Sequence, residues 1–137
     1  MSDCIFCKIR DNEMPAFKVY EDDLFIVIMD RFPAGKGHVL IIPKEHAENI
    51  FEISDEVAKG LYPMAKKFAE VLKEVLGADG INIVQNNGLA ATQAVFHFHL
   101  HVIPRFDGDK VRINQPTTYE TTVEEIEEVA KLIKNAL

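Results

Sequence analysis

Three of the five histidines in this chain stand at alternate positions in one short stretch, His97-Phe98-His99-Leu100-His101-Val102-Ile103. The residues between them are apolar and favour β-strands. Because successive side chains of a strand point to opposite faces of the sheet, the three imidazoles are predicted to share one face. Imidazoles change charge near neutral pH, so such a row can bind a metal, attack an electrophile or move protons.

The composition is that of an ordinary soluble protein. Of the 137 residues, 47% are hydrophobic and 27% are charged, which suits one domain with a buried core. The sequence has no apolar run of the ~20 residues that span a bilayer and no signal-peptide pattern, so we expect a cytoplasmic protein without a membrane partner. The net charge of -7 argues against a nucleic-acid partner. A small anion could still bind locally, and Lys36, Lys44 and Arg105 are candidates.

The rest of the chain predicts an α+β fold with an antiparallel sheet. Strands are expected over residues 17–21, 24–29, 38–42, 81–84 and 95–103. Pro43 and Pro104 are expected to end the third and the last of them. The sheet face that carries Phe98 and Leu100 is expected to lie under a long helix, which leaves the histidines facing a solvent cleft.

Three helices are expected around this sheet. A short helix covers residues 4–10, and a long helix begins after Ser54 and ends at Gly77. Pro63 lies inside the long helix and predicts a kink or a meeting of two helices. Thr122 and Glu125 form a capping-box pattern before an amphipathic C-terminal helix.

Cys4 and Cys7, the two cysteines of the chain, form a C-x-x-C pair. A reducing compartment disfavours a disulfide, and a thioredoxin-like redox motif would need a strand before Cys4. Two histidines would complete a tetrahedral zinc site with the two cysteines. The candidates are His38, His46 and the row itself. The alternative is that both cysteines are simply small buried residues.

The second hypothesis for the row is nucleophilic catalysis at phosphorus. An imidazole can attack a phosphoryl group when one ring nitrogen is unprotonated and the other is held as N–H. Hydrogen-bond donors nearby would neutralise charge on the phosphoryl oxygens. Asn86 and Gln93, in the loop before the row, are candidate polar contacts. Strand stability does not favour three alternating histidines, so we favour a functional role.

The row resembles the His-φ-His-φ-His-φ-φ motif (φ, hydrophobic) of the histidine triad, or HIT, family of nucleotide hydrolases and transferases. Residues 4–9, 19–23, 37–46, 85–88 and 93–97 also resemble family blocks, so the resemblance spans roughly residues 4–105. It implies a single HIT domain over residues 1–137, with a five-stranded antiparallel sheet covered by one long helix and a C-terminal helix. It also implies a homodimer whose two sheets continue as ten strands.

The resemblance implies catalytic roles for three histidines. His99 would be the nucleophile that forms a nucleotidyl-histidine intermediate. His101 would contact the phosphoryl and leaving-group oxygens, and His38 would lie behind the triad and help to order it.

The resemblance also implies how substrate and metal are held. Asp30 would take the ribose hydroxyls, and Asn86 and Gln93 would lie near the phosphate. In the zinc-bearing branch of the family, a structural Zn²⁺ would be held by four residues: Cys4, Cys7, His46 and His97.

The implied activity is attack on the α-phosphate of nucleoside phosphoramidates or dinucleoside polyphosphates, with release of a nucleoside monophosphate. The small-molecule partner would be a purine nucleotide. Ala94 stands where the family carries Ser or Thr, which removes one hydroxyl contact to the phosphate. This departure keeps open a nucleotide-binding regulatory module with weak catalysis. A zinc-held interaction domain without a nucleotide site is a further alternative. The segment after Arg105 matches no family block.

Overall fold

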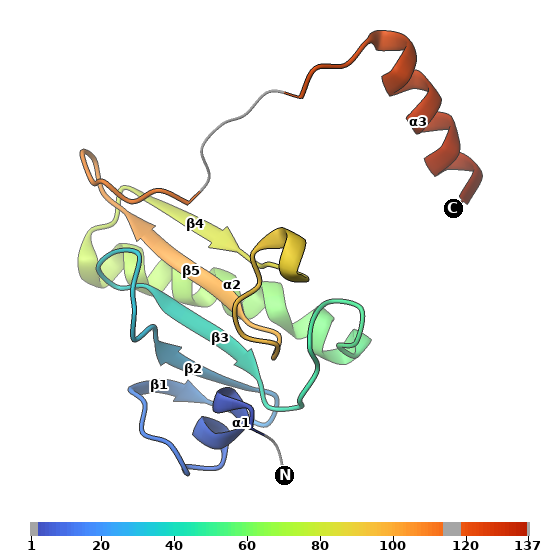
Figure 1. The fold of residues 1–137 in the computed structure, drawn as a ribbon. Coiled ribbons are helices and arrows are strands. Elements are labelled where there is room, and N and C mark those ends of the chain that lie inside the picture. Colours follow the sequence, from blue (N-terminus) through green and yellow to red (C-terminus); the bar gives the residue numbers. More distant parts are fainter. Residues whose placement is uncertain (1–2, 114–118, 137) are drawn as a thin grey trace.

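The computed structural model describes residues 3–113 and 119–136, and its centre is one antiparallel sheet (Figure 1). The strands are β1 (Lys18–Glu21), β2 (Phe25–Met29), β3 (Val39–Pro43), β4 (Gly80–Val84) and β5 (Leu100–Arg105). Their order in the sheet is β1-β2-β3-β5-β4, and each neighbouring pair is antiparallel. The predicted α+β fold with five antiparallel strands is confirmed.

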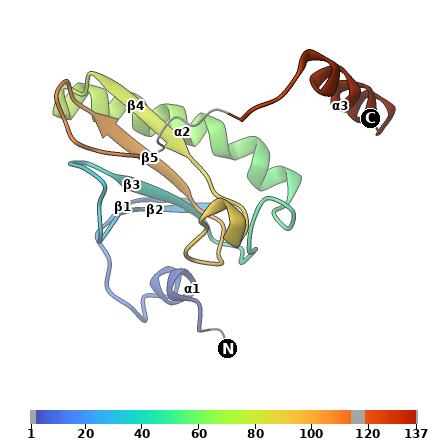
Figure 2. The ribbon, with the colours of Figure 1, turned by 45° about the horizontal axis from the view of Figure 1, so that its top comes forward.

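Two helices, α1 (Ile5–Arg10) and α2 (Asp55–Leu76), lie on opposite sides of the sheet (Figure 2). The α2 side forms one core cluster, in which Phe68 and Leu72 pack with Leu100 and Val102 of β5. On the other side, residues of α1 pack on β2 and β3: the cluster is Phe6, Ile9, Ile26, Ile28, Leu40 and Ile42. The prediction that the long helix covers the Leu100 face is confirmed, but the histidine face is partly covered as well.

The ends of α2 follow the sequence prediction. The Ser54 hydroxyl accepts a hydrogen bond from the Val57 N–H at 3.1 Å. Gly77 ends the helix in the left-handed conformation with φ of 69°. Pro63 lies inside one continuous helix, so the alternative of two helices is wrong. Its ring is exposed, and buried side chains on both sides of it hold the helix to the sheet.

Replacing Pro63 by alanine should raise the free energy of unfolding by about 1–3 kcal/mol. Alanine restores the N–H that can bond to the Lys59 carbonyl, and no core contact is lost because the proline is exposed. Urea unfolding of the full chain measures the change. Lys66→Ala, an exposed position in the same helix, is the control and should change the value little. An unchanged midpoint for Pro63→Ala would contradict the expectation.

The histidine stretch is less regular than a strand over residues 95–103, and that prediction is wrong at both ends. β5 begins only at Leu100, because the preceding segment bonds to the loop after β3, with the Phe98 N–H donating to the Ala47 carbonyl at 2.7 Å. Pro104 does not end the strand but lies within it opposite Ile81. Pairing of β5 with β3 reaches only as far as Val102, so the missing proline N–H removes no bond to β3.

The C-terminal helix, α3 (Val123–Ala136), projects away from the sheet (Figure 1). Its start is as predicted, since the Glu125 N–H donates to the Thr122 hydroxyl oxygen at 3.2 Å. The Glu125 carboxylate accepts from the Thr121 hydroxyl at 2.9 Å. Among the described residues, no helix has both the length and the apolar character needed to cross a membrane.

Candidate functional site

The four residues expected to bind zinc converge from three separate parts of the chain. Cys4 and Cys7 lie at the start of α1, His46 follows β3, and His97 precedes β5. The Nδ1 atom of His97 lies 3.3 Å from Cys4 Sγ, 3.6 Å from Cys7 Sγ and 3.1 Å from His46 Nδ1. Cys7 Sγ lies 3.4 Å from His46 Nδ1. All four candidate ligand atoms therefore face one point.

These distances fit a tetrahedral zinc ion. Zinc bonds of about 2.3 Å to sulfur and 2.0–2.1 Å to nitrogen require sulfur–nitrogen separations of about 3.5 Å and a nitrogen–nitrogen separation of about 3.4 Å. The Nε2–H of His97 donates to the Pro43 carbonyl at 2.8 Å, which leaves Nδ1 unprotonated toward the cluster. The donor set suits Zn²⁺, and four protein ligands leave no position for a water molecule.

A second cluster joins Asp30, His38 and His101. The Nδ1 atom of His38 accepts from the Ala34 N–H at 3.0 Å, so the neutral ring carries its proton on Nε2. That Nε2–H faces His101 Nδ1 at 2.9 Å and the Asp30 carboxylate at 3.3 Å. His101 therefore accepts at Nδ1 and presents its own N–H at Nε2.

The same hydrogen bonds make this second cluster a poor metal site, although its ligand atoms lie within 4.8 Å of one another. A metal at His38 Nε2 would move the ring proton to Nδ1. There it would point at the Ala34 N–H, and two donors would face each other at 3.0 Å. The cluster is better suited to fix the tautomer of His101.

His99 has the opposite tautomer from His101. Its Nδ1–H donates to the backbone carbonyl of His97 at 2.7 Å, so Nε2 carries the lone pair. Within the described part of the chain, Nε2 has no hydrogen-bond partner, yet every buried side-chain nitrogen or oxygen has one. The Nε2 atom is therefore reachable from solvent, although the residue is only 8% exposed.

The prediction that the histidines face an open cleft needs correction. His38 and His97, like His99, are buried. The reason is α1, whose Phe6 ring stands edge-on to His99 at 5.1 Å and to His97 at 5.8 Å between ring centroids. Phe6 thus packs against both His97 of the metal cluster and the ring of His99.

Burial keeps these imidazoles neutral at neutral pH. It lowers the pKa of His97 to about 4, and burial together with the neighbouring His99 and His38 lowers the pKa of His101 to about 4. Burial also lowers the pKa of His38 and of His99 below 6.5, against the opposing effect of Asp30. A neutral ring is the form that has a lone pair for nucleophilic attack.

Of the three residues predicted to contact the substrate, Asp30 and Asn86 have side-chain polar atoms that could bind a ligand. Asp30 follows β2, accepts from the Phe32 N–H at 2.8 Å and lies beside His38. The side-chain amide of Asn86 is half-buried and makes no hydrogen bond to any residue that the structure describes.

Gln93 is placed differently from its predicted neighbours. It is 3% exposed and lies just after the short 3-10 helix η1 (Leu89–Ala91). Its side-chain oxygen, Oε1, accepts from the Gly88 N–H at 2.7 Å. Its amide donates to the carbonyls of Glu48 at 2.6 Å and Val95 at 3.0 Å. The side chain therefore joins the loops around the triad.

Sequence reasoning missed several groups that orient the histidines. The Pro43 carbonyl and the Ala34 N–H set ring tautomers, but backbone atoms carry no signal in a sequence. Arg10 bonds to the Lys44 carbonyl at 2.7 Å, two residues before the candidate zinc ligand His46. Of these groups, only Phe6 could have been suspected from the sequence, since it lies between the two cysteines of the C-x-x-C pair.

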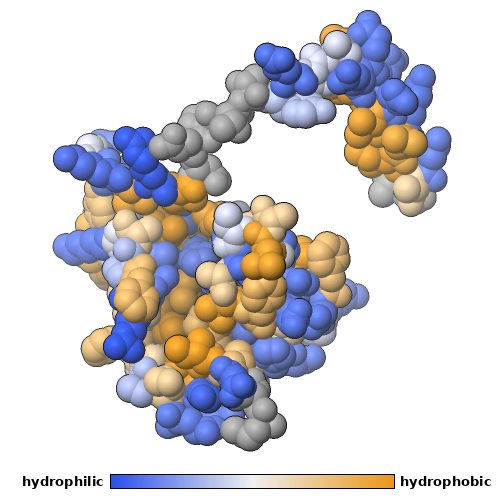
Figure 3. Space-filling view, in the orientation of Figure 1, coloured by the Kyte–Doolittle hydropathy of each residue, from blue (hydrophilic) through white to orange (hydrophobic). Residues whose placement is uncertain are grey.

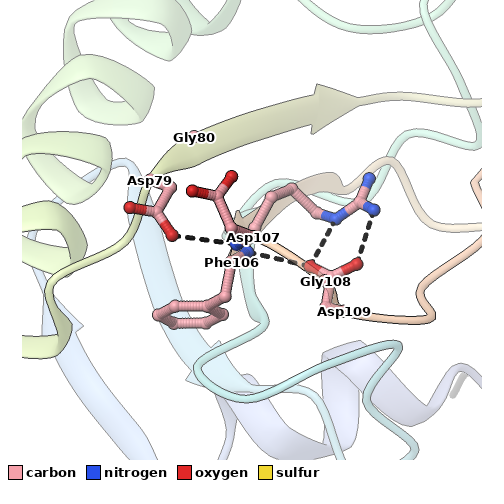
Figure 4. A pocket seen from close by; sticks show the side chains of 7 residues that line it. Asp79, Gly80, Phe106, Asp107, Gly108 and Asp109 are labelled. Carbon is pink, nitrogen blue, oxygen red and sulfur yellow. Dashed lines mark hydrogen bonds and ion pairs between the residues drawn. The ribbon is translucent and has the colours of Figure 1, made fainter.

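A shallow hollow at the far end of β5 involves none of the histidines (Figure 4). Arg105 donates to both oxygens of Asp109 at 2.7–2.9 Å, and the Asp107 N–H donates to Asp79 at 2.8 Å. These groups satisfy one another and hold a turn. Arg105, a candidate for anion binding, is thus already paired with a carboxylate.

Comparison with known proteins agrees with this geometry. A family model described as the HIT domain matches residues 11–108. The chain belongs to the HIT family. An uncharacterized HIT-like protein of Borreliella burgdorferi is 41% identical over 97% of each chain. The adenosine 5'-monophosphoramidase of Schizosaccharomyces pombe is 42% identical over 74% of each chain. The adenylylsulfatase of Arabidopsis thaliana is 40% identical over 79% of this chain and 55% of that one.

Solved structures of HIT proteins share the fold. A HIT family protein from Bacillus anthracis has a TM-score of 0.90 and 37% identity, covering 99% of this chain and 98% of that one. A HIT protein from Bacillus subtilis has a TM-score of 0.91 and 36% identity over the same shares. A zinc-bound histidine triad protein from Mycobacterium smegmatis has a TM-score of 0.78 and 36% identity, covering 98% of each chain.

Proposed function

We propose that this HIT protein hydrolyses purine nucleoside phosphoramidates or dinucleoside polyphosphates at the α-phosphate and releases a nucleoside monophosphate. The observation that carries the proposal is the protonation pattern at His99. Its Nε2 is unprotonated and reachable, while its Nδ1–H is held by the His97 carbonyl. The relatives that are named as a phosphoramidase and an adenylylsulfatase support the same reaction class.

In the first step, His99 Nε2 forms a bond to phosphorus and the bond from phosphorus to the leaving group breaks. The leaving group departs with that electron pair and takes its proton from solvent. Positive charge develops on the ring of His99, and the His97 carbonyl stabilises it through the Nδ1–H. In the second step, water attacks phosphorus and releases a proton to solvent, and the electron pair of the phosphorus–nitrogen bond returns to Nε2.

His101 and His38 act in this scheme as an oriented donor and its support. The Ala34 N–H fixes His38, and His38 fixes the Nδ1 side of His101. The Nε2–H of His101 is thereby directed outward, where it can donate to a phosphoryl oxygen as negative charge increases there. Asp30 and Asn86 are proposed to contact ribose and phosphate, and Gln93 to order the loop that carries Asn86.

Zn²⁺ is proposed as a structural ion held by Cys4, Cys7, His46 and His97, where it supplies a fixed tetrahedral anchor. The zinc-bound mycobacterial relative supports this assignment. Of these four residues, His97 is the one that connects the zinc site to catalysis. Its side chain faces the cluster, and its backbone carbonyl orients the nucleophile His99. His97 thus links the fold of the N-terminus to the reactive ring.

The proposal also covers partners and location. We propose a homodimer whose sheets join through edge strands, and a cytoplasmic location where both thiols stay reduced for zinc. The single-domain assignment for residues 1–137 belongs to the same proposal.

Steady-state assays with adenosine 5'-phosphoramidate and with diadenosine tetraphosphate test the function and separate the two substrate classes. Turnover of either substrate by the zinc-loaded protein supports the hydrolase. The second candidate, a nucleotide-binding module with weak catalysis, is favoured by Ala94, whose exposed methyl offers no hydroxyl to the phosphate. Binding of a nucleoside monophosphate without turnover of either substrate would select the module.

The pH dependence of kcat/KM should follow the lowered pKa of His99. Protonation at Nε2 removes the nucleophilic lone pair, and burial lowers this pKa below 6.5. We therefore expect the acidic midpoint of the kcat/KM profile to lie below pH 6.5. A phosphoramidate assay with an enzyme-free blank at each pH measures the profile. An acidic midpoint at or above 6.5 would be incompatible with a buried neutral nucleophile.

A further inference from the structure

The loop after β4 contains two amide side chains that bond to each other on either side of Asn86. Gln85 Nε2 donates to Asn87 Oδ1 at 2.8 Å, and Asn87 Nδ2 donates back to Gln85 Oε1 at 2.6 Å. Gln85 Nε2 also donates to the Asn86 carbonyl at 3.0 Å. Asn87 Oδ1 also accepts from the Ile50 N–H at 2.8 Å. Asn86 therefore lies between two neighbours whose side chains are fixed.

Two backbone groups determine which end of each amide is oxygen and which is nitrogen. The Asn86 carbonyl needs a donor and so faces Gln85 Nε2, whereas the Ile50 N–H needs an acceptor and so faces Asn87 Oδ1. With both amides oriented in this way, each presents its oxygen to the nitrogen of the other. A carboxylate or an aliphatic side chain at either position would lose at least one bond of the pair, so the pair depends on these two residue types.

The bond to Ile50 attaches the loop to a segment that also holds the histidine row. Within residues 47–50, the Ala47 carbonyl accepts from the Phe98 N–H at 2.7 Å. Phe98 lies inside the row, so Asn87 and the row are bonded to the same short segment. This common support fixes the position of the loop relative to the triad.

The register of the sheet directs the loop toward the nucleophile. At the end of β4, Val84 pairs with His101 of β5. Because the two strands are antiparallel, continuing the same register would bring Asn86 opposite His99. Residues that lie opposite each other on antiparallel strands share one face of the sheet. The path of the chain therefore favours Asn86 as a neighbour of the reactive ring.

Asn86 is the polar side chain of this loop that is left to bind a ligand. Its amide is half-buried and makes no hydrogen bond to any residue that the structure describes. The Thr92 hydroxyl donates to the Ala91 carbonyl at 2.6 Å, and the Gln93 amide is already bonded to backbone groups. Residues 88–91 carry no polar side-chain group, and Figure 3 shows a mainly apolar surface where η1 lies in Figure 1.

We infer that the Gln85–Asn87 pair positions Asn86 for the phosphate of the nucleotide. Gln85 and Asn87 are positioning residues, which act by fixing the backbone on both sides of Asn86. An amide that is held in place before binding can donate to a phosphoryl oxygen without the entropy cost of ordering its loop. The inference rests on the proposed function, in which Asn86 contacts the phosphate.

A double-mutant cycle tests whether Asn87 acts through Asn86. The zinc-loaded full chain carries Asn86→Ala, Asn87→Ala or both, and two quantities are measured: kcat/KM for adenosine 5'-phosphoramidate and the Kd of adenosine monophosphate. Each single change should lower kcat/KM and raise the Kd about tenfold. In the Asn86→Ala background, Asn87→Ala should change either value by less than about twofold, because the residue that it positions is gone. A merely structural role of Asn87 would give the same loss in both backgrounds.

Two further variants complete the design. Gln85→Ala removes the other half of the pair and should reproduce Asn87→Ala. Leu89→Ala, at an exposed position of the same loop, should leave both values near wild type. Additive losses in the cycle, or wild-type values for Asn87→Ala and Gln85→Ala, would overturn the inference and leave the hydrolase standing. A wild type that binds adenosine monophosphate without turnover would refute the hydrolase alone, since the cycle is then read from the Kd. A wild type that does neither would refute both.

Discussion

Replacing His99 by alanine should lower kcat/KM for nucleotide hydrolysis by about 10⁴-fold or more. The variant loses a ring whose unprotonated Nε2 is reachable from solvent and makes no hydrogen bond to any described residue. The other imidazoles cannot substitute. His97 Nδ1 faces the cysteines, and the Nδ1 atoms of His38 and His101 already accept hydrogen bonds. Steady-state kinetics on a phosphoramidate measure the loss.

The control separates lost chemistry from lost structure. His99→Asn keeps a side-chain N–H that can donate to the His97 carbonyl, and it should be as inactive as His99→Ala. Zinc content and the unfolding midpoint should stay close to wild type in at least one of the two variants. His101→Ala should lose less, about 10²–10⁴-fold, because it removes a donor and not the nucleophile. Activity of either His99 variant within tenfold of wild type would exclude attack by this residue.

A rapid-quench experiment extends the same prediction. During turnover, the wild-type protein should carry a nucleotidyl group on the peptide that contains His99, visible by mass spectrometry at alkaline pH. His99→Asn should carry none. An adduct on a peptide without His99 would move the nucleophile to another residue.

The histidine pattern predicted a shared face, and the structure shows why that was only partly informative. Alternation along the chain correctly placed Leu100 and Val102 toward α2. It could not show that Phe98 bonds to the Ala47 carbonyl in place of a strand, since that partner lies 51 residues away in the sequence. It also could not show that Phe6 covers the histidines, because α1 packs on the sheet through contacts distant in sequence.

The candidate zinc cluster and the ring tautomers differ in how far they could be predicted. Cys4, Cys7, His46 and His97 followed from residue type and family resemblance, because metal binding selects particular side chains. The tautomers of His97 and His38 are instead set by the backbone carbonyl of Pro43 and the backbone N–H of Ala34. Almost any residue at these two positions would offer the same backbone atom. Their effect depends on the path of the backbone and so becomes visible only in three dimensions. That Gln93 lies near the phosphate stays a prediction, and its three hydrogen bonds, which join the loops around the triad, could not be foreseen from the sequence.

Removing the zinc site should be the largest perturbation of stability. His46→Ala should lower the free energy of unfolding by about 3–5 kcal/mol and the melting temperature by ~10–20 °C. The reason is that His46 is exposed, so its loss removes a ligand with little loss of packing. Without the ion, the two cysteines would no longer be joined to His46 through the metal, and α1 would be held near the turn after β3 only by the Arg10 bond to the Lys44 carbonyl and by its packing on the sheet. Thermal unfolding with and without a chelator measures the effect.

The neighbouring residue supplies the matched control. Glu45→Ala is also an exposed substitution in the same turn, and it should retain about one zinc ion per chain and the wild-type melting temperature. A chelator should bring the wild type down to the level of His46→Ala and should not lower His46→Ala further. Because the His97 carbonyl orients His99, kcat/KM should fall about 10–100-fold in the metal-free protein. If the wild-type protein contains no zinc and its melting temperature does not change with a chelator, the structural role of zinc is excluded. The position of His97 would then be set by the Pro43 carbonyl and by Phe6 alone.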